Sequence, residues 1–173
     1  MPIASVFLRP DGASGAGHVG FAFEHSEGKS IVGALENMHG GPINDPQHAT
    51  FWHRLVKNSK VMNYFRAMDY QTFKSIEVPP EACSVEGALA AVKRWEDSGY
   101  NVLTRNCLHA THDVLTGYGA ALPKPDGLRR IPNEWYERLP GRSEVVVPDF
   151  DMFTRKKLTK EEAADPGVEL LPL

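Results

Sequence analysis

A β-hairpin predicted close to the N-terminus is the feature that most constrains the fold of this chain. From His18 to Glu24, apolar residues alternate with polar or small ones, which is the period-two pattern of a half-buried strand. A turn containing glycine follows, and the partner strand is expected to begin at Ser30. Pairing of Glu24 with Ser30 across the turn would set the register. Glu36 then lies opposite His18 on the same face, whereas a shift of one residue would place Asn37 there.

The order of the other expected elements indicates an α+β fold. Strands are expected at residues 3–8, 18–24, 30–37 and 70–78. Helices are expected at residues 49–58, 106–115 and 133–139. A further helix is expected to begin after Ser84 as its N-cap and to stop at Gly99, and Gly117 is expected to close the helix that opens at Asn106. Strands and helices are segregated rather than alternating, which predicts an antiparallel sheet packed on helices.

The length and composition indicate one domain with a tail. A chain of 173 residues can bury a hydrophobic core without staples, and 42% hydrophobic with 24% charged residues is an ordinary globular balance. We expect a single catalytic domain over residues 1–157 and a C-terminal tail over residues 158–173. Within that tail, Thr159 and Glu162 could cap one turn of helix.

Charge and hydropathy argue against several classes of function. The net charge of −3 gives no electrostatic reason to expect nucleic acid or an anionic membrane as a partner. No apolar stretch approaches transmembrane length, and the apolar run at residues 3–8 is too short for the core of a signal peptide. We therefore expect a soluble protein with no stable membrane anchor, made in the cytoplasm or exported without a cleavable signal.

Cys107 is the candidate nucleophile. It follows Asn106 and opens a predicted helix. A helix N-terminus carries partial positive charge and unpaired backbone N–H groups, which lower the pKa of a thiol and can form part of an oxyanion hole. The alternative is a structural cysteine, because free cysteines are among the most buried residues. The second cysteine, Cys83, is interpreted as an apolar filler, and two cysteines do not make a disulfide framework.

A cysteine nucleophile needs a base within hydrogen-bond reach, and that base needs an orienting partner. His18 begins the predicted strand and suits the base, and the hairpin register offers Glu36 or Asn37 as the orienting group. The alternatives are a surface histidine and an exposed carboxylate at a strand end. His109 and His112 share the helix of the cysteine. The Cys-x-His-x-x-His pattern on one helix does not present three zinc ligands on one face, so we expect no metal.

The segment Tyr-Asn-Val-Leu-Thr-Arg-Asn-Cys-Leu-His-Ala-Thr-His-Asp-Val-Leu, residues 100–115, resembles the cysteine helix of the circularly permuted papain-like enzymes. Gly17-His18-Val19, followed by the alternating strand, looks like their histidine strand. This group spans permuted NlpC-type peptidases, lecithin retinol acyltransferase-like enzymes and PPPDE-type peptidases. The resemblance covers roughly residues 15–140, with histidine before cysteine, the reverse of papain. This chain departs from the pattern at Ala110, where an aromatic residue often follows Cys-x-His.

The resemblance implies that Cys107 is the nucleophile, that His18 is the base and that Glu36 or Asn37 is the orienting group. We expect a thiol-dependent hydrolase that cleaves an amide, peptide or isopeptide bond through an acyl-enzyme, without a cofactor. Its substrate would be a peptide, a peptidoglycan-like compound or another acyl compound, selected by the loops at residues 38–48 and 117–132. One alternative is an acyltransferase or thioesterase acting on a lipid or carrier-bound acyl group. Another is a non-catalytic binding module in which the cysteine is structural.

Overall fold

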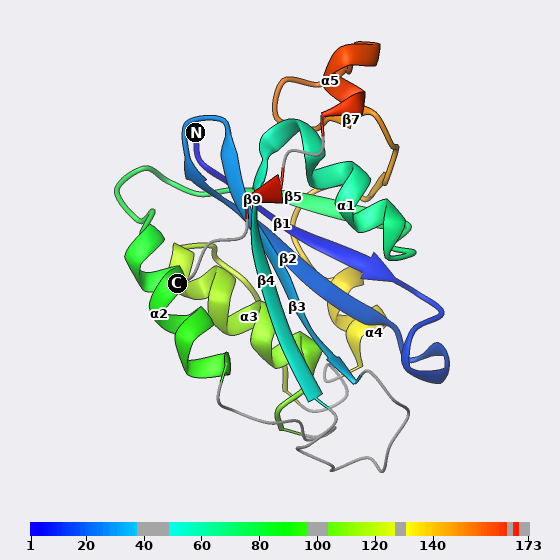
Figure 1. Cartoon of the computed structure of the whole chain (residues 1–173). Helices are drawn as coiled ribbons and strands as arrows, with labels where there is room; N and C mark the ends of the chain where they lie inside the picture. The colour runs from blue at the N-terminus through cyan, green and yellow to red at the C-terminus, as the bar shows by residue number, and fades with distance from the viewer. Residues whose placement is uncertain (38–48, 97–103, 127–130, 166–167, 170–173) are drawn as a thin grey trace.

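The computed structural model describes residues 1–37, 49–96, 104–126, 131–165 and 168–169. In this part of the chain, an antiparallel sheet carries α2 and α3 on one face and α1 on the other (Figure 1). The strands are β1 (Ile3–Arg9), β2 (His18–Ser26), β3 (Lys29–Asn37), β4 (Ala49–Lys57), β5 (Thr72–Glu77), β6 (Glu144–Val145), β7 (Phe150–Asp151), β8 (Lys156–Lys157) and β9 (Val168–Glu169). The helices are α1 (Val61–Ala67), α2 (Val85–Glu96), α3 (Cys107–Tyr118), α4 (Pro132–Glu137) and α5 (Lys160–Ala164), with short 3-10 helices at Ala13–Gly15 and Asn58–Lys60.

The main sheet has the strand order β6-β5-β1-β2-β3-β4-β9, and every neighbouring pair is antiparallel. The strands β7 and β8 form a separate two-stranded sheet. This arrangement confirms the predicted α+β class with an antiparallel sheet packed on helices.

The register of the β2–β3 hairpin is the predicted one, because Glu24 pairs with Ser30. The ladder between the two strands continues only as far as the pair Phe21–Gly33 within the described residues. Beyond it, β2 remains paired with β1, where His18 lies opposite Arg9. The first three residues of β2 therefore pair with β1 but have no described ladder pair with β3. The edge of their backbone that faces β3 is available to another element.

The two faces of β2 serve different cores. Val19, Phe21 and Phe23 pack with α2 and α3, as the alternation predicts. Ala22 belongs to the second cluster, between the sheet and α1. Because the side chains of a strand alternate between its faces, His18 shares the face of Ala22.

The position of α3 depends on an asparagine and two glycines. Asn106 is the N-cap, and its side chain accepts hydrogen bonds from the backbone N–H groups of the first turn. The predicted stop at Gly117 is wrong, since α3 continues to Tyr118 and ends at Gly119, whose φ is +107°. Gly117 instead lies where α3 crosses α2, and a Cβ there would come within 2.7 Å of the Gly87 carbonyl oxygen.

On α2, the predicted N-cap at Ser84 is confirmed by a hydrogen bond from the Gly87 N–H, whereas the predicted stop at Gly99 lies outside the described residues.

The helix predicted at residues 49–58 is wrong, because this segment forms β4. The strand pairs with β3 along its whole length, from Ala49 to Lys57. Phe51 packs against the cluster of α2 and α3, while Trp52 packs against the cluster of α1. Apolar residues therefore occur on both faces, and they hide the period of two by which a half-buried strand is recognised.

Described parts of the predicted tail contact the rest of the chain. Thr159 and Glu162 form the capping box of α5, as the sequence suggested. At the other end of α5, the ammonium of Lys60 donates hydrogen bonds to the carbonyls of Glu162 and Ala163, the latter at 2.8 Å. Further along, β9 pairs with β4 at the edge of the sheet.

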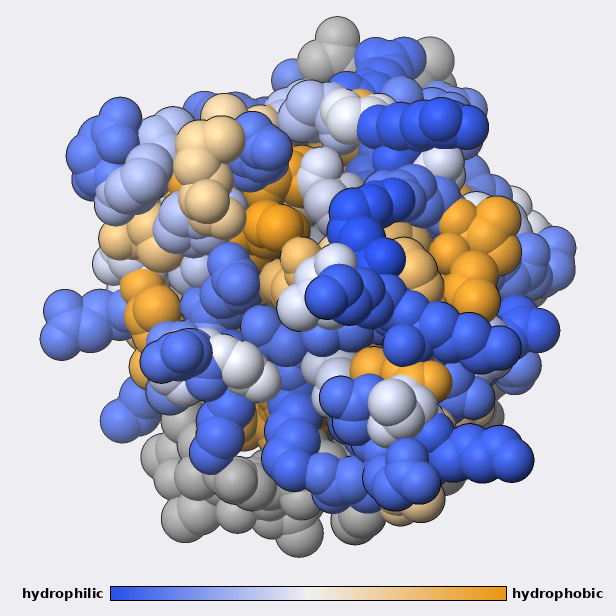
Figure 2. All heavy atoms as spheres, turned by 90° about the horizontal axis from the view of Figure 1, so that it is seen from above, coloured by the Kyte–Doolittle hydropathy of each residue, from blue (hydrophilic) through white to orange (hydrophobic). Residues whose placement is uncertain are grey.

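The large apolar side chains that are exposed in the described structure are Met1, Ile131, Val145 and Val147. Figure 2 shows one face of the molecule as mainly hydrophilic, with apolar patches scattered over it. Among the described helices, none has the length and apolar character required to cross a bilayer.

Gly119→Ala tests the end of α3. We expect it to lower the free energy of unfolding by about 2 kcal/mol or more, because alanine is strained at positive φ and its Cβ would lie 2.1 Å from the Ala82 carbonyl oxygen. Gly28→Ala is the matched control, since Gly28 also has a positive φ, +71°, but has no atom near an added Cβ. Urea denaturation of both variants measures the difference, and equal losses would show that the contact with Ala82 is unimportant.

Candidate functional site

The predicted site residues come from elements that meet at one end of the sheet. The first residue of α3, the start of β2 and the end of β3 lie together at the lower end of the molecule in Figure 1. These three elements carry Cys107, His18 and Glu36, and the structure brings these side chains together. Asn37 ends β3 and its backbone pairs with Ala49, but its side chain lies outside the described part of the chain, as does the predicted specificity loop at residues 38–48.

The side chain of Glu36 lies beside His18, as the hairpin register predicts. The His18 Nε2 and Glu36 Oε1 atoms are 2.9 Å apart, and both residues are buried. The Nε2–H bond is not aligned with Oε1 as in a linear hydrogen bond, so we describe this short contact as an ion pair. Burial would raise the pKa of Glu36, but His18 and then Arg9 and Trp52 lower it, which keeps the carboxylate charged.

Cys107 is the first residue of α3, and only 4% of it is exposed. Burial alone would raise the pKa of the thiol, but the charge of His18, a hydrogen bond with its ring and a hydrogen bond from the backbone of Val19 outweigh burial and lower the pKa. Val19 belongs to the part of β2 that lies beyond the ladder with β3. The α3 N-terminus thus meets β2 where the backbone is not paired with β3.

The pKa of His18 is shifted in the opposite direction. Burial disfavours its charge, but Cys107 first and Glu36 second outweigh burial and raise the pKa from 6.5 to about 9. A lowered thiol pKa together with a raised imidazole pKa favours a thiolate and an imidazolium at neutral pH. Each of the two groups thus favours the charged form of the other, and Glu36 contacts the same imidazole at Nε2.

Asn106 fixes the cysteine at the helix start. Its Oδ1 accepts hydrogen bonds from the N–H groups of Leu108, at 3.1 Å, and His109, at 3.2 Å. The same oxygen lies 2.8 Å from the His109 Nδ1, so this histidine belongs to the cap. The cap does not use the N–H of Cys107, which is one of the helix N-terminal N–H groups that could form part of an oxyanion hole.

Three residues around Glu36 were not predicted from the sequence. The Tyr70 hydroxyl donates to Glu36 Oε1 at 3.3 Å, and an Arg9 guanidinium nitrogen lies 3.4 Å from Oε2. The indole of Trp52 makes a smaller contribution to the lowered pKa of Glu36, although its buried N–H forms no hydrogen bond that meets the usual geometry. Arg9 could have been found as the cross-strand neighbour of His18, had the pairing of the first two strands been known. Tyr70 was predicted as the first residue of a strand at residues 70–78, but β5 begins at Thr72 and Tyr70 lies in the turn after α1, a helix that was not predicted. The sequence therefore carried no signal for its contact with Glu36.

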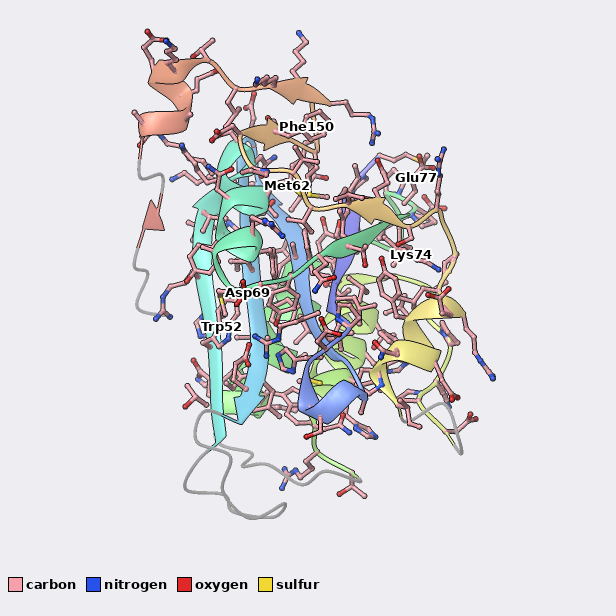
Figure 3. All side chains as sticks on the ribbon, turned by 90° about the vertical axis from the view of Figure 1, so that its right-hand side faces the viewer. Trp52, Met62, Asp69, Lys74, Glu77 and Phe150 are labelled. Atoms are coloured by element: carbon pink, nitrogen blue, oxygen red, sulfur yellow. The ribbon has the colours of Figure 1, made fainter. Side chains whose placement is uncertain are left out.

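A cavity of about 430 Å³ borders Glu36 on the α1 side of the sheet. Its wall is formed by Arg9, Glu36, Thr50, Trp52, Arg54, Tyr64, Met68 and Asp69. Figure 3 shows Trp52 of β4 and Asp69, which follows α1, on this side of the molecule. The Glu36 carboxylate therefore contacts His18 and also borders this cavity, whose wall does not include Cys107.

The remaining candidates lie elsewhere. Cys83 is half-buried and interacts with the hydroxyl of Tyr118, and neither cysteine forms a disulfide. The ring of His112 packs edge-on against Trp135. Within the described residues, no group of three or more histidine, cysteine, aspartate or glutamate side chains is arranged to hold a metal ion.

A thiol, an imidazole and a carboxylate brought together in this way are the parts that a nucleophilic acyl-transfer site requires. No protein-family model, curated protein or solved structure matches this chain. The geometry of the site is therefore the ground for a proposed function.

The pH dependence of alkylation tests the ion pair. We expect the iodoacetamide reaction of Cys107 to reach half its maximum below the ordinary thiol pKa of about 8.5. In His18→Gln the midpoint should rise above that value, because burial remains and the cation is lost. Restricted access of iodoacetamide to the buried sulfur lowers the rate at every pH and therefore does not by itself move the midpoint.

His53→Gln is the matched control for this experiment. His53 lies on β4 and is paired with Glu96 at the end of α2, outside this site. Cys83, followed in the same samples by peptide mass spectrometry, is an internal reference. The same midpoint in wild type and His18→Gln would contradict the ion pair.

Proposed function

We propose that this protein is a cysteine hydrolase that cleaves an amide bond in a peptide, isopeptide or related acyl substrate through an acyl-enzyme on Cys107. The observation that carries the proposal is the buried pairing of Cys107 with His18, with Glu36 in contact with the same imidazole. A structural cysteine needs no cation beside it. Strongly shifted groups of complementary charge are more typical of catalytic sites than of a packed core.

We further propose that the fold is the circularly permuted papain-like one. In support, the histidine strand precedes the cysteine helix in the chain, the cysteine is the first helical residue, and the acid comes from the strand that forms a hairpin with the histidine strand. The sheet is antiparallel and the cysteine helix packs on one of its faces.

In the proposed first step, the Cys107 thiolate attacks the carbonyl carbon of the substrate. The resulting tetrahedral intermediate collapses when the C–N bond breaks, and the His18 imidazolium gives its proton to the departing amine. The products of this step are a free amine, a thioester on Cys107 and a neutral His18. The backbone N–H of Cys107, which the Asn106 cap leaves unused, is the proposed donor to the oxyanion.

In the second step, water attacks the thioester carbonyl while His18 accepts a proton from the water. The C–S bond breaks, the carboxylic acid leaves, and the thiolate–imidazolium pair forms again. Glu36 stays ionised throughout and stabilises each imidazolium state. Since attack needs the thiolate and amine release needs the His18 proton, amide cleavage should fall as the pH rises through about 9.

A pair of small acyl donors tests the proposal without knowledge of the natural substrate. We expect p-nitrophenyl acetate to acetylate Cys107 in a rapid burst that mass spectrometry detects, and N-acetylated amino-acid p-nitroanilides to be cleaved more slowly. His18→Gln should lose anilide cleavage by about 100-fold or more, because the amine must be protonated. Its loss with the ester should be smaller, because nitrophenolate leaves without a proton.

Cys83→Ala should behave as wild type and Cys107→Ala should show no burst. Acetylation of Cys107 that is no faster than acetylation of Cys83 would contradict the proposal and favour a structural cysteine.

A further inference from the structure

Tyr70 is built into the proposed site, although the sequence predicted it only as the first residue of a strand at residues 70–78, and the observed strand β5 begins at Thr72. It is completely buried, and its hydroxyl donates to Glu36 Oε1 at 3.3 Å. This is the same oxygen that lies 2.9 Å from His18 Nε2. The rings of Tyr70 and His18 are 5.8 Å apart. One carboxylate oxygen thus contacts both the phenol and the imidazole.

The fold reserves the space for this phenol. The backbone N–H of Tyr70 donates to the Phe65 carbonyl, which turns the chain back after α1. On the facing strand, Gly20 has no side chain, and a Cβ there would lie 3.1 Å from the Tyr70 hydroxyl and 2.9 Å from the Phe65 ring. Since Gly20 and His18 share one face of β2, the glycine lets the phenol reach the acid beside the histidine.

Arg9 holds the second carboxylate oxygen. Its guanidinium lies 3.4 Å from Glu36 Oε2, donates to the Met68 carbonyl at 3.2 Å and lies 5.6 Å from the centre of the Tyr70 ring. About 29% of its side chain is exposed, so its contribution is screened more than that of the buried phenol. Among the described residues, the charged or titratable groups around Glu36 are His18 on β2, Arg9 on β1, Cys107 on α3, Tyr70 after α1, and Arg54, Tyr64 and Asp69 in the wall of the adjoining cavity.

The Glu36 carboxylate needs contacts that keep it beside His18. Glu36 borders a cavity of about 430 Å³, so its side chain has space to turn away from His18. We propose that Tyr70 is a positioning residue, which keeps Glu36 Oε1 against the catalytic imidazole while Arg9 holds the other oxygen. The inference rests on the proposed function, in which His18 is the base, and it adds to it the residue that keeps the acid in place.

A double-mutant cycle tests this role by NMR titration of the His18 ring. Tyr70→Phe removes one oxygen atom and should lower the pKa of His18 by about half a pH unit or more, because the acid loses its fixed position. In a Glu36→Gln background the same change should have no effect, since Tyr70 acts through Glu36. Tyr136→Phe, which removes another buried hydroxyl, bound to Ser143, is the control and should leave the titration unchanged.

Two results would overturn the inference. An unchanged or raised pKa in Tyr70→Phe would mean that the phenol does not position the acid, or that it only competes with His18 for it. An equal fall in both backgrounds would mean that Tyr70 acts by packing and not through Glu36. The titration needs no substrate, so a failure here is separate from a failure of Cys107 to take up an acyl group, which would overturn the proposed function instead.

Discussion

The buried pairing of Cys107 with His18 is the interaction on which the rest of this site depends. Removing a thiolate and an imidazolium from water costs several kcal/mol for each ion, and their mutual attraction compensates only when further hydrogen bonds are well placed. The structure supplies these from both sides. The backbone of Val19 bonds to the sulfur, and Glu36 stabilises the imidazolium. The start of α3 adds the positive end of a helix dipole to the thiolate.

The need for these stabilising contacts gives several features of the backbone a common role. The ladder between β2 and β3 stops at Phe21, which leaves the Val19 backbone available to the thiol. Gly117 allows α3 to lie close to α2, and the Asn106 cap fixes where the helix begins. A helix start, a strand end and a hairpin partner thereby converge on one point. Each of them is set by a local rule of backbone geometry and not by the chemistry that they make possible.

Local patterns predicted much of this site. The turn after Glu24 gave the hairpin register, and the register placed Glu36 beside His18, since a period of two leaves no other choice once one pair is known. The pattern failed for β4, where both faces are partly buried, and it missed α1 altogether. The contact of Tyr70 with Glu36 could not be predicted for the same reason. Tyr70 reaches it from the turn after α1, and a contact between residues so far apart in sequence depends on tertiary packing that no local periodicity encodes.

The central claim is that Cys107 and His18 hold opposite charges at neutral pH. The measurement that tests it most directly is the titration of the His18 ring in wild type and in Cys107→Ser, with the signal assigned by its loss in His18→Gln. Because Cys107 is the largest influence that raises the pKa of His18, the account predicts a value of about 9 in wild type and a clearly lower value in the serine variant, where burial remains and the thiolate is lost. The same pKa for His18 in both proteins would contradict the ion pair and the account built on it.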